Sequence, residues 1–278
     1  MQCHQRLGDR EAKAGAVFGE DAWIGAAEDV FRFVVENMSE NDKTGGKTGG
    51  KMTGRLHHTW CAGEGRHPAV LDDYANMALA ALVLHGVTGQ ADYLGRAQGW
   101  VQIADNHYWD VDNGGYFLGA DDTGDVIARS KPVHDNAVPA GNGVMAGVHA
   151  RLFYLTGKVA QQARADATIA AFSGELERSF SALSTLLNSN ELLHRAVQIV
   201  VFGSRADAGT ESLLGVIHRA CLPNRVLQLC DPGAETDASH PAAAKGPVDG
   251  KATAYVCRGP TCSLPITDPA ELGRALAG

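Results

Sequence analysis

The chain has little of what marks several specialised classes of protein. Its Lys and Arg number 24 against 32 Asp and Glu, and no dense basic stripe is present, which argues against a nucleic-acid-binding protein. No apolar run approaches the roughly 20 residues that span a bilayer, so we expect no membrane partner. The 6 cysteines in 278 residues are too few for a disulfide scaffold. Residues 1–15 lack the apolar stretch of a signal peptide, so we expect a reducing, cytoplasmic location.

Familiar cofactor motifs are also missing or incomplete. Thr44–Lys51 resembles a phosphate-binding loop, but Met52 stands where a Ser or Thr would hold magnesium, and no strand precedes it. The tandem Thr-Gly-Gly-Lys repeat therefore indicates a flexible insertion. Asp110, Asp112 and Asp121 partly imitate a calcium loop, but no Glu closes it. We expect neither a cofactor nor a metal.

What the chain does have is a repeat of about seventy residues. Helix-sized segments run into the turns Val17–Gly19, Val87–Gly89 and Leu155–Gly157, and each turn leads into another helical pattern. A period of this size is typical of stacked helical hairpins, none of which buries its apolar face alone. The sequence therefore predicts a mainly α fold over residues 1–192, in the form of a partial (α/α) toroid.

The helices of this region can be placed from their apolar spacing. We expect them over Leu71–Leu84, Tyr93–Ala104, Gly143–Leu155, Ala163–Leu176 and Phe180–Asn190. The Leu71 and Gly143 helices occupy equivalent places in the repeat, so their starts should line one rim of the stack. Between them, the Asn-Gly step inside Trp109–Leu118 predicts a small β-hairpin at that rim.

Residues 193–278 have a different pattern, which predicts a second, small α/β unit. Val197–Gly203, Arg225–Cys230 and Ala252–Cys257 are strand candidates, with helices near Glu211–Ala220 and Pro269–Leu276. Nearly continuous apolar strands around a helix favour a parallel sheet. Asp231–Gly250 is interpreted as a loop. For Cys257 and Cys262 a structural role and a reversible disulfide both stay open, because their spacing is not that of a CxxC pair.

The predicted rim gathers the residues most capable of chemistry. Asp72 and Asp73 open one repeated helix, while His134, Asp135 and Asn142 precede or begin the next. Carboxylates and an imidazole converging there have the residue types needed for acid–base work on a sugar. The alternative is that Asp72 and Asp73 only cap their helix.

Several segments together resemble one family. They are His67–Ala75, Asp135–Asn142, Leu222–Val226, and Ala254–Cys257 with Cys262–Pro269. In these segments the chain resembles the C-terminal part of the spermatogenesis-associated protein 20 family, whose members join a thioredoxin-like domain to an (α/α) toroid. The chain departs from the family at Ala140, where Ser is frequent, and at the Thr-Gly-Gly-Lys insertion. It supplies three of the six hairpins that close a toroid, so an open half-ring would need the missing half or another chain to cover its apolar faces.

That resemblance implies a carbohydrate pocket of the epimerase or six-hairpin glycosidase kind. In this interpretation Asp72, Asp73, His134 and Asp135 are the catalytic candidates, and Tyr74, Asn142, Trp109 and Trp60 contact the substrate. The alternative is a non-catalytic scaffold or partner-binding region that supports a redox function lying outside this chain. The aromatic residues Trp60, Tyr74, Trp109 and Tyr116 distinguish the two, because a sugar site needs them at the rim and a scaffold packs them inward.

Overall fold

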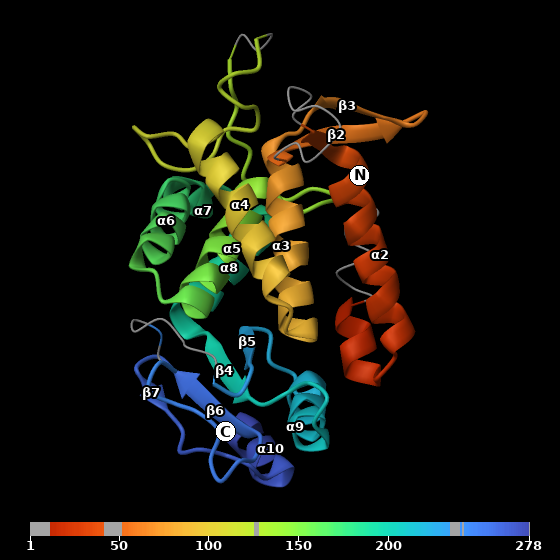
Figure 1. The fold of residues 1–278 in the computed structure, drawn as a ribbon. Helices are drawn as coiled ribbons and strands as arrows, with labels where there is room; N and C mark the ends of the chain where they lie inside the picture. Colours follow the sequence, from red (N-terminus) through yellow and green to blue (C-terminus); the bar gives the residue numbers. More distant parts are fainter. Residues whose placement is uncertain (1–11, 42–51, 125–127, 234–239, 241, 278) are drawn as a thin grey trace.

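Helical hairpins form one end of the molecule and a small α/β unit forms the other (Figure 1). The computed structural model describes residues 12–41, 52–124, 128–233, 240 and 242–277. The helices of the first part are α2 (Asp21–Met38), α3 (Leu71–Thr88), α4 (Ala91–His107), α5 (Gly141–Thr156), α6 (Val159–Ala170), α7 (Ser173–Ser179) and α8 (Ser184–Arg195), with a 3₁₀ turn at Phe180–Leu183. Residues 12–18 are helical as well.

Two of the repeated turns end their helices in the same way. Gly89 after α3 and Gly157 after α5 have φ of 76° and 68°, the left-handed conformation that glycine adopts without a Cβ penalty. Their N–H groups donate to the carbonyls of His85 and Phe153. In both turns the preceding Thr hydroxyl donates to the carbonyl four residues earlier. The repeat in the sequence is thus a repeat of one capping structure.

The hairpins α3–α4 and α5–α6 stand side by side, with α8 against α5. Helices α3 and α5 are apolar around most of their circumference because neighbours cover them on several sides. Tyr74, Met77, Met145 and Val148 lie in the core that they share. The prediction of a mainly α fold built as a partial toroid of hairpins, followed by a small α/β unit, is confirmed.

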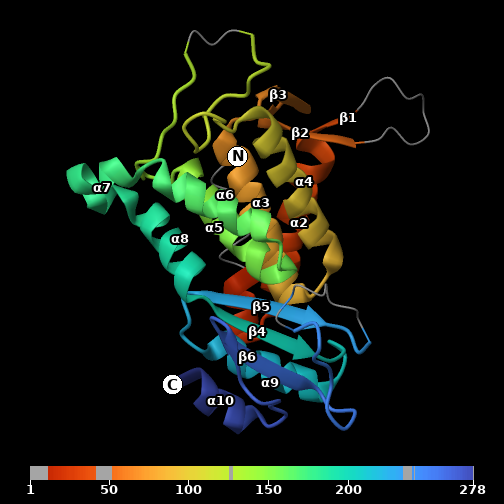
Figure 2. The ribbon, with the colours of Figure 1, turned by 90° about the vertical axis from the view of Figure 1, so that its left-hand side faces the viewer.

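The α/β unit is a four-stranded sheet in the order β5-β4-β6-β7. Its elements are β4 (Val197–Phe202), α9 (Ala208–Arg219), β5 (Arg225–Cys230), β6 (Thr253–Arg258), β7 (Thr261–Cys262) and α10 (Pro269–Ala277). Figure 2 shows α9 and α10 on the face of the sheet that points away from the helical hairpins. The opposite side meets the ends of α3 and α5, and the Gln198 side chain donates to the carbonyl of Tyr154 at 2.6 Å.

The expected parallel sheet is only partly correct. Strands β4 and β5 are parallel across the α9 connection, but β6 runs antiparallel to β4. The described parts of the β5–β6 connection contain turns rather than a helix, and an antiparallel return needs no crossover helix. The predicted division at residue 192 stays a prediction.

The mainly α region 1–192 also contains a second sheet, which the sequence analysis did not predict. Strands β1 (Ser39–Asn41), β2 (Met52–Cys61) and β3 (Glu64–Pro68) form an antiparallel sheet at the end where α3 begins (Figure 1). The β2–β3 turn is made by Ala62 and Gly63, both with positive φ, as a tight two-residue hairpin requires. Alanine is rare in this conformation, so the turn has no clear signal in the sequence.

The predicted hairpin around the Asn-Gly step is smaller than expected. Trp109 and Tyr116 form a single antiparallel bridge, and Gly114 and Gly115 have positive φ. The Asp110 carboxylate holds the turn by accepting from the backbone N–H groups of Asp112 and Asn113, which replaces strand pairing. The Thr-Gly-Gly-Lys repeat lies outside the described residues.

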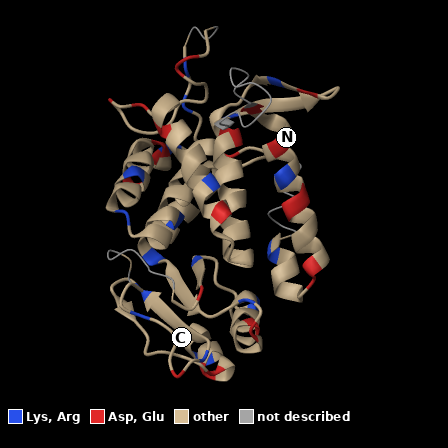
Figure 3. Ribbon diagram, in the orientation of Figure 1, with Lys and Arg blue, Asp and Glu red and all other residues tan. Residues whose placement is uncertain are grey.

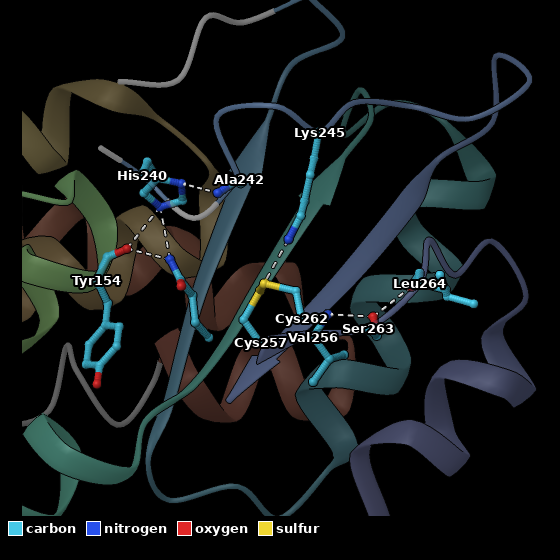
Figure 4. Close-up of a disulfide and its surroundings, with 10 residues drawn as sticks. Tyr154, His240, Ala242, Lys245, Val256, Cys257, Cys262, Ser263 and Leu264 are labelled. Atoms are coloured by element: carbon cyan, nitrogen blue, oxygen red, sulfur yellow. Dashed lines mark hydrogen bonds between the residues drawn. A yellow bond between two sulfur atoms is a disulfide. The ribbon is translucent and has the colours of Figure 1, made fainter. Parts of the chain in front are cut away.

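Cys257 and Cys262 are joined by a disulfide (Figure 4). They pair directly across β6 and β7, the edge of the sheet. Cys257 is buried, and the Lys245 ammonium lies 3.7 Å from its sulfur. The bond therefore fixes a two-residue edge strand that has few other contacts.

Loss of this disulfide should cost a modest part of the stability. We expect Cys262→Ser, or reduction of the unaltered chain, to lower the free energy of unfolding by about 2 kcal/mol, as the short closed loop implies. Urea unfolding with and without a reductant measures the change. Cys221→Ser is the matched control because Cys221 is a free, exposed thiol. An equal loss of stability in Cys221→Ser would contradict the stabilising role of the disulfide.

Candidate functional site

The starts of α3 and α5 meet at one rim, as the repeat predicts. The Asp72 carboxylate on α3 accepts a hydrogen bond from the backbone N–H of Gly141, the first residue of α5, at 3.0 Å. A Cβ at position 141 would displace that carboxylate, so glycine preserves the contact. Burial, and next the charge of Asp73, raise the pKa of Asp72. A half-buried carboxyl group with a raised pKa is a candidate for proton transfer.

Asp73 is fully buried and holds the start of its own helix. Its Oδ2 accepts from the backbone N–H of Val70 at 2.9 Å and lies 2.7 Å from Nδ1 of His58 on β2. Burial raises the pKa of Asp73, and the His58 imidazole opposes that rise. Asp73 therefore has the capping role that the sequence offered as the alternative, and it also joins α3 to the N-terminal sheet.

Asp135 links the starts of two helices. Its Oδ1 accepts from the N–H of Ala140, directly before α5, at 2.9 Å, and its Oδ2 accepts from the N–H of Thr185 in α8 at 2.7 Å. Both carboxylate oxygens are thus engaged with the backbone. His134 next to it is exposed and faces Glu175 at 3.5 Å.

Asn142 is fully buried, and backbone groups engage both its amide nitrogen and its amide oxygen. Its side-chain oxygen accepts from the N–H of Tyr116 at 2.7 Å, and its amide donates to the carbonyls of Tyr116 and Pro132, each at 2.9 Å. It thereby attaches the 109–116 turn to α5.

The four aromatic residues differ in burial, since Trp60 and Trp109 are only half-buried. Tyr74 and Tyr116 are fully buried, and the Tyr74 hydroxyl accepts from the N–H of Leu56 at 3.0 Å. Trp60 lies on β2 against Phe33, and the Arg164 guanidinium covers the ring of Trp109 at 3.9 Å. The two buried tyrosines therefore form no sugar platform, which favours the scaffold alternative for these two residues.

A cavity of about 460 Å³ lies between the inner helices α3, α5 and α8. The polar groups along it are amides, hydroxyls, an arginine and the ammonium of Lys13, and the apolar ones are aliphatic. Its described lining includes Asn76, Leu79, Pro139, Val144, Arg151, Thr185, Asn188, Ser189, Leu192 and Asn224. Asn76 connects it to the rim because its amide donates to the backbone carbonyl of Asp72, one turn earlier. Sequence reasoning missed Asn188 and Asn224, for which the repeat gives no signal.

A buried polar network behind the rim was missed as well. The Tyr116 hydroxyl lies 2.5 Å from the Asp105 carboxylate and 2.6 Å from Nε2 of His149. Nδ1 of His149 lies 2.6 Å from the Gln161 side chain, and Arg164 lies 3.4 Å from Asp105. A signal was present, since His149 follows Asn142 by seven residues and so shares its face of an otherwise apolar helix.

One group among the described residues has the ligand types of a metal site, namely His107, Asp121 and Asp122. Asp121 lies 2.9 Å from His107, and Asp122 accepts from the Arg55 guanidinium. The guanidinium charge opposes a bound cation, so we assign no metal there.

Sequence relatives of the chain bear on its resemblance to a family. No protein-family model matches the chain. Spermatogenesis-associated protein 20 of Homo sapiens is 30% identical over 95% of the chain, and the mouse protein of that name is 28% identical. The predicted resemblance to the spermatogenesis-associated protein 20 family is confirmed. An uncharacterized protein of Caenorhabditis elegans is 24% identical over 94% of the chain. The chain spans about a third of the length of these relatives, 34% of the human protein.

Solved structures similar to the chain come from carbohydrate enzymes. A cellobiose 2-epimerase of Spirochaeta thermophila is 17% identical, with a TM-score of 0.44 over 62% of this chain and 42% of that one. A family 76 α-mannanase of Bacteroides thetaiotaomicron is 11% identical, with a TM-score of 0.48 over 77% of this chain and 56% of that one. These scores are low, so the two structures assign neither a substrate nor a reaction to this chain.

The predictions of no membrane partner and no nucleic-acid partner concern the apolar helices and the charges of the chain. Within the described residues, no helix combines the length and the apolar character that a bilayer span requires. Figure 3 shows acidic and basic residues dispersed over both units of the described chain, without a continuous basic stripe.

Proposed function

We propose that the chain binds a small polyhydroxylated compound of the carbohydrate class in the cavity between α3, α5 and α8. The observation that carries the proposal is the chemistry of this cavity. Asn188 and Asn224 bring amides to a space of about 460 Å³, and Thr185 and Ser189 add hydroxyls. This volume is within the range of small-ligand sites. Amides and hydroxyls both donate and accept, as sugar hydroxyls do.

Asp72 is the residue that we propose for proton transfer on such a ligand. It lies one helical turn from Asn76, which lines the cavity, and its Oδ1 is oriented by the Gly141 N–H. Because its pKa is raised, the Asp72 carboxyl group holds a proton more readily than a surface Asp does. Asp73, Asp135 and Asn142 have structural roles in this proposal, because each accepts hydrogen bonds from backbone N–H groups at a helix start or a turn.

The test is a thermal-shift screen against monosaccharides, N-acetyl sugars and short oligosaccharides, with hits measured by calorimetry. We expect a saturable rise of the melting temperature, since ligand at one hundred times its dissociation constant stabilises a fold by about 2.7 kcal/mol. Asn188→Ala with Asn224→Ala should weaken binding about tenfold or more, as the loss of two hydrogen bonds implies. Asn106→Ala, an exposed residue of α4, is the control. A hit that the double variant binds unchanged would place the ligand elsewhere.

Asp72→Asn separates catalysis from binding. The amide oxygen still accepts from Gly141, so we expect a change in stability below about 1 kcal/mol and binding that is nearly unchanged. Turnover of any bound sugar by epimerase or hydrolase chemistry should disappear. Full turnover in this variant would exclude Asp72 as the acid or base.

A second candidate function is a partner-binding scaffold within a longer protein of the family, including one whose redox function lies outside this chain. The burial of Tyr74 and Tyr116 favours it. An exposed aromatic pair also favours it, since Phe18 and Trp23 contact edge to face at 6.0 Å and are 70% and 42% exposed. Under this proposal the sugar screen gives no hit, and Phe18→Ser with Trp23→Ser abolishes binding to the remaining part of such a protein.

A further inference from the structure

A second, smaller cavity lies where the helical hairpins meet the α/β unit. It has a volume of about 80 Å³ and lies between the ends of α3 and α5 on one side and α9 and β5 on the other. All the charged side chains in its described lining are basic, in a chain with a net charge of −8. The ionisable residues that line it are Lys13, Arg151, His218 and Arg225.

Arg225, the first residue of β5, brings a positive charge into a partly buried place. Its guanidinium donates to the backbone carbonyl of Ile217, and no carboxylate of the described chain forms an ion pair with it. Burial lowers the pKa of Arg225, and no acidic neighbour offsets that change. A buried charge is ordinarily paired, because removal from water is costly. A negatively charged group in the cavity would supply the pairing.

His218 on α9 is the second observation, and it is independent of the first. The residue is 7% exposed, and its Nε2 is buried without a hydrogen-bond partner in the described part of the chain. Burial, followed by the charges of Arg225 and Arg205, lowers the pKa of His218 to about 4. The imidazole is therefore neutral at pH 7. With its proton on Nε2, it offers one N–H donor for which the protein provides no acceptor.

We propose that this cavity binds the oxyanion group, phosphate or carboxylate, of a small ligand. The guanidinium of Arg225 and the Nε2–H of His218 are its donors, and Lys13 and Arg151 add positive charge at the lining. A guanidinium suits an oxyanion because its N–H groups match the spacing of two oxygens. The space of about 80 Å³ holds one such group and no sugar ring.

The two cavities share Lys13 and Arg151 in their linings, so they adjoin each other. One ligand can therefore place hydroxyl groups in the larger cavity and its anionic group in the smaller one. The ligand class becomes a phosphorylated sugar or a sugar acid. This extension rests on the proposed carbohydrate function, whereas oxyanion binding by itself does not.

The first experiment uses inorganic phosphate and acetate with the full chain, at constant ionic strength set by chloride. We expect a saturable rise in melting temperature and a calorimetric binding signal, with the stronger of the two anions identifying the group. Arg225→Gln should weaken binding at least tenfold, Arg225→Lys should weaken it less, and His218→Leu should weaken it more than His218→Gln. Arg195→Gln removes an equal charge from an exposed site on α8 and should bind as the unaltered chain does.

A measurement on the unaltered chain covers the case in which the Arg225 variants do not fold. The ring signals of His218 in an NMR spectrum should shift on addition of the anion, while those of the exposed His194 should not. Unmoved His218 signals, or equal binding by Arg225→Gln, would overturn the proposal.

The second experiment compares a hexose with its 6-phosphate and with the matching uronic acid. We expect the charged compound to bind at least tenfold more tightly, and Arg225→Gln to remove that advantage. Phosphate binding without any sugar binding would sustain the oxyanion site and contradict the proposed carbohydrate function. Equal affinity for charged and neutral sugars would sustain the carbohydrate function and contradict a single ligand that spans both cavities.

Discussion

Replacing Asp135 by alanine is expected to lower the free energy of unfolding by about 2–4 kcal/mol, because two backbone N–H groups lose a charged acceptor at once. These groups belong to Ala140 and Thr185, at 2.9 and 2.7 Å from the carboxylate oxygens. They lie at the starts of α5 and α8, so the substitution loosens both helices and the contact between them. Urea unfolding at pH 7 measures the change.

Two variants make this result specific. Asp135→Asn keeps a neutral acceptor for one of the two N–H groups, so its loss should lie between those of the unaltered chain and the alanine variant. His134→Ala, the exposed neighbour, should change the stability by less than about 0.5 kcal/mol. A stable Asp135→Ala chain that no longer binds sugar would contradict the structural role and restore Asp135 to the site.

The fold was largely predictable because its repeat depends on residues that are close together in the sequence. Gly89 and Gly157 must adopt a conformation that glycine favours, and the threonine before each one caps the same turn. The N-terminal sheet was not predictable in this way. Its tight turn uses Ala62 where Asn or Asp is usual. Strand β2 itself lacks a regular alternation of apolar and polar residues.

The position of the rim could be predicted, but the roles of its residues could not. A carboxylate at a helix start has the same local pattern whether it binds a ligand or caps a helix. For Asp135 the deciding partner is Thr185, which lies fifty residues further along the chain. For Asn142 the partners are main-chain groups of Tyr116 and Pro132, which carry no sequence signal. Only the folded arrangement shows that these side chains are already engaged.

The second large effect is expected at the buried network of Tyr116, Asp105 and His149. Tyr116→Phe should lower the free energy of unfolding by about 3 kcal/mol, because a buried imidazole nitrogen and a carboxylate lose a partner together. A hydroxyl has one hydrogen. It is donated to Asp105, while Nε2 of His149 lies 2.6 Å from the hydroxyl oxygen and Nδ1 lies 2.6 Å from the side-chain oxygen of Gln161. Tyr255→Phe is the control, since its hydroxyl donates only to the backbone carbonyl of Gly246, and its loss should be nearer 1 kcal/mol.

The same network makes the stability depend on pH. Burial lowers the pKa of His149 below its ordinary value of 6.5, although the charge of Asp105 opposes the shift. Below about pH 6.5 the imidazole of the unfolded chain binds a proton, whereas the buried imidazole of the folded chain stays neutral. The free energy of unfolding therefore decreases as the pH falls. His218 and His85 have lowered pKa values and act in the same direction.

Unfolding in urea should therefore show a lower free energy of unfolding at pH 5 than at pH 7, and His149→Gln should reduce this difference. His194→Gln, which removes an exposed histidine, should leave the slope unchanged. A chain equally stable at both pH values would mean that these imidazoles are not buried in their neutral form.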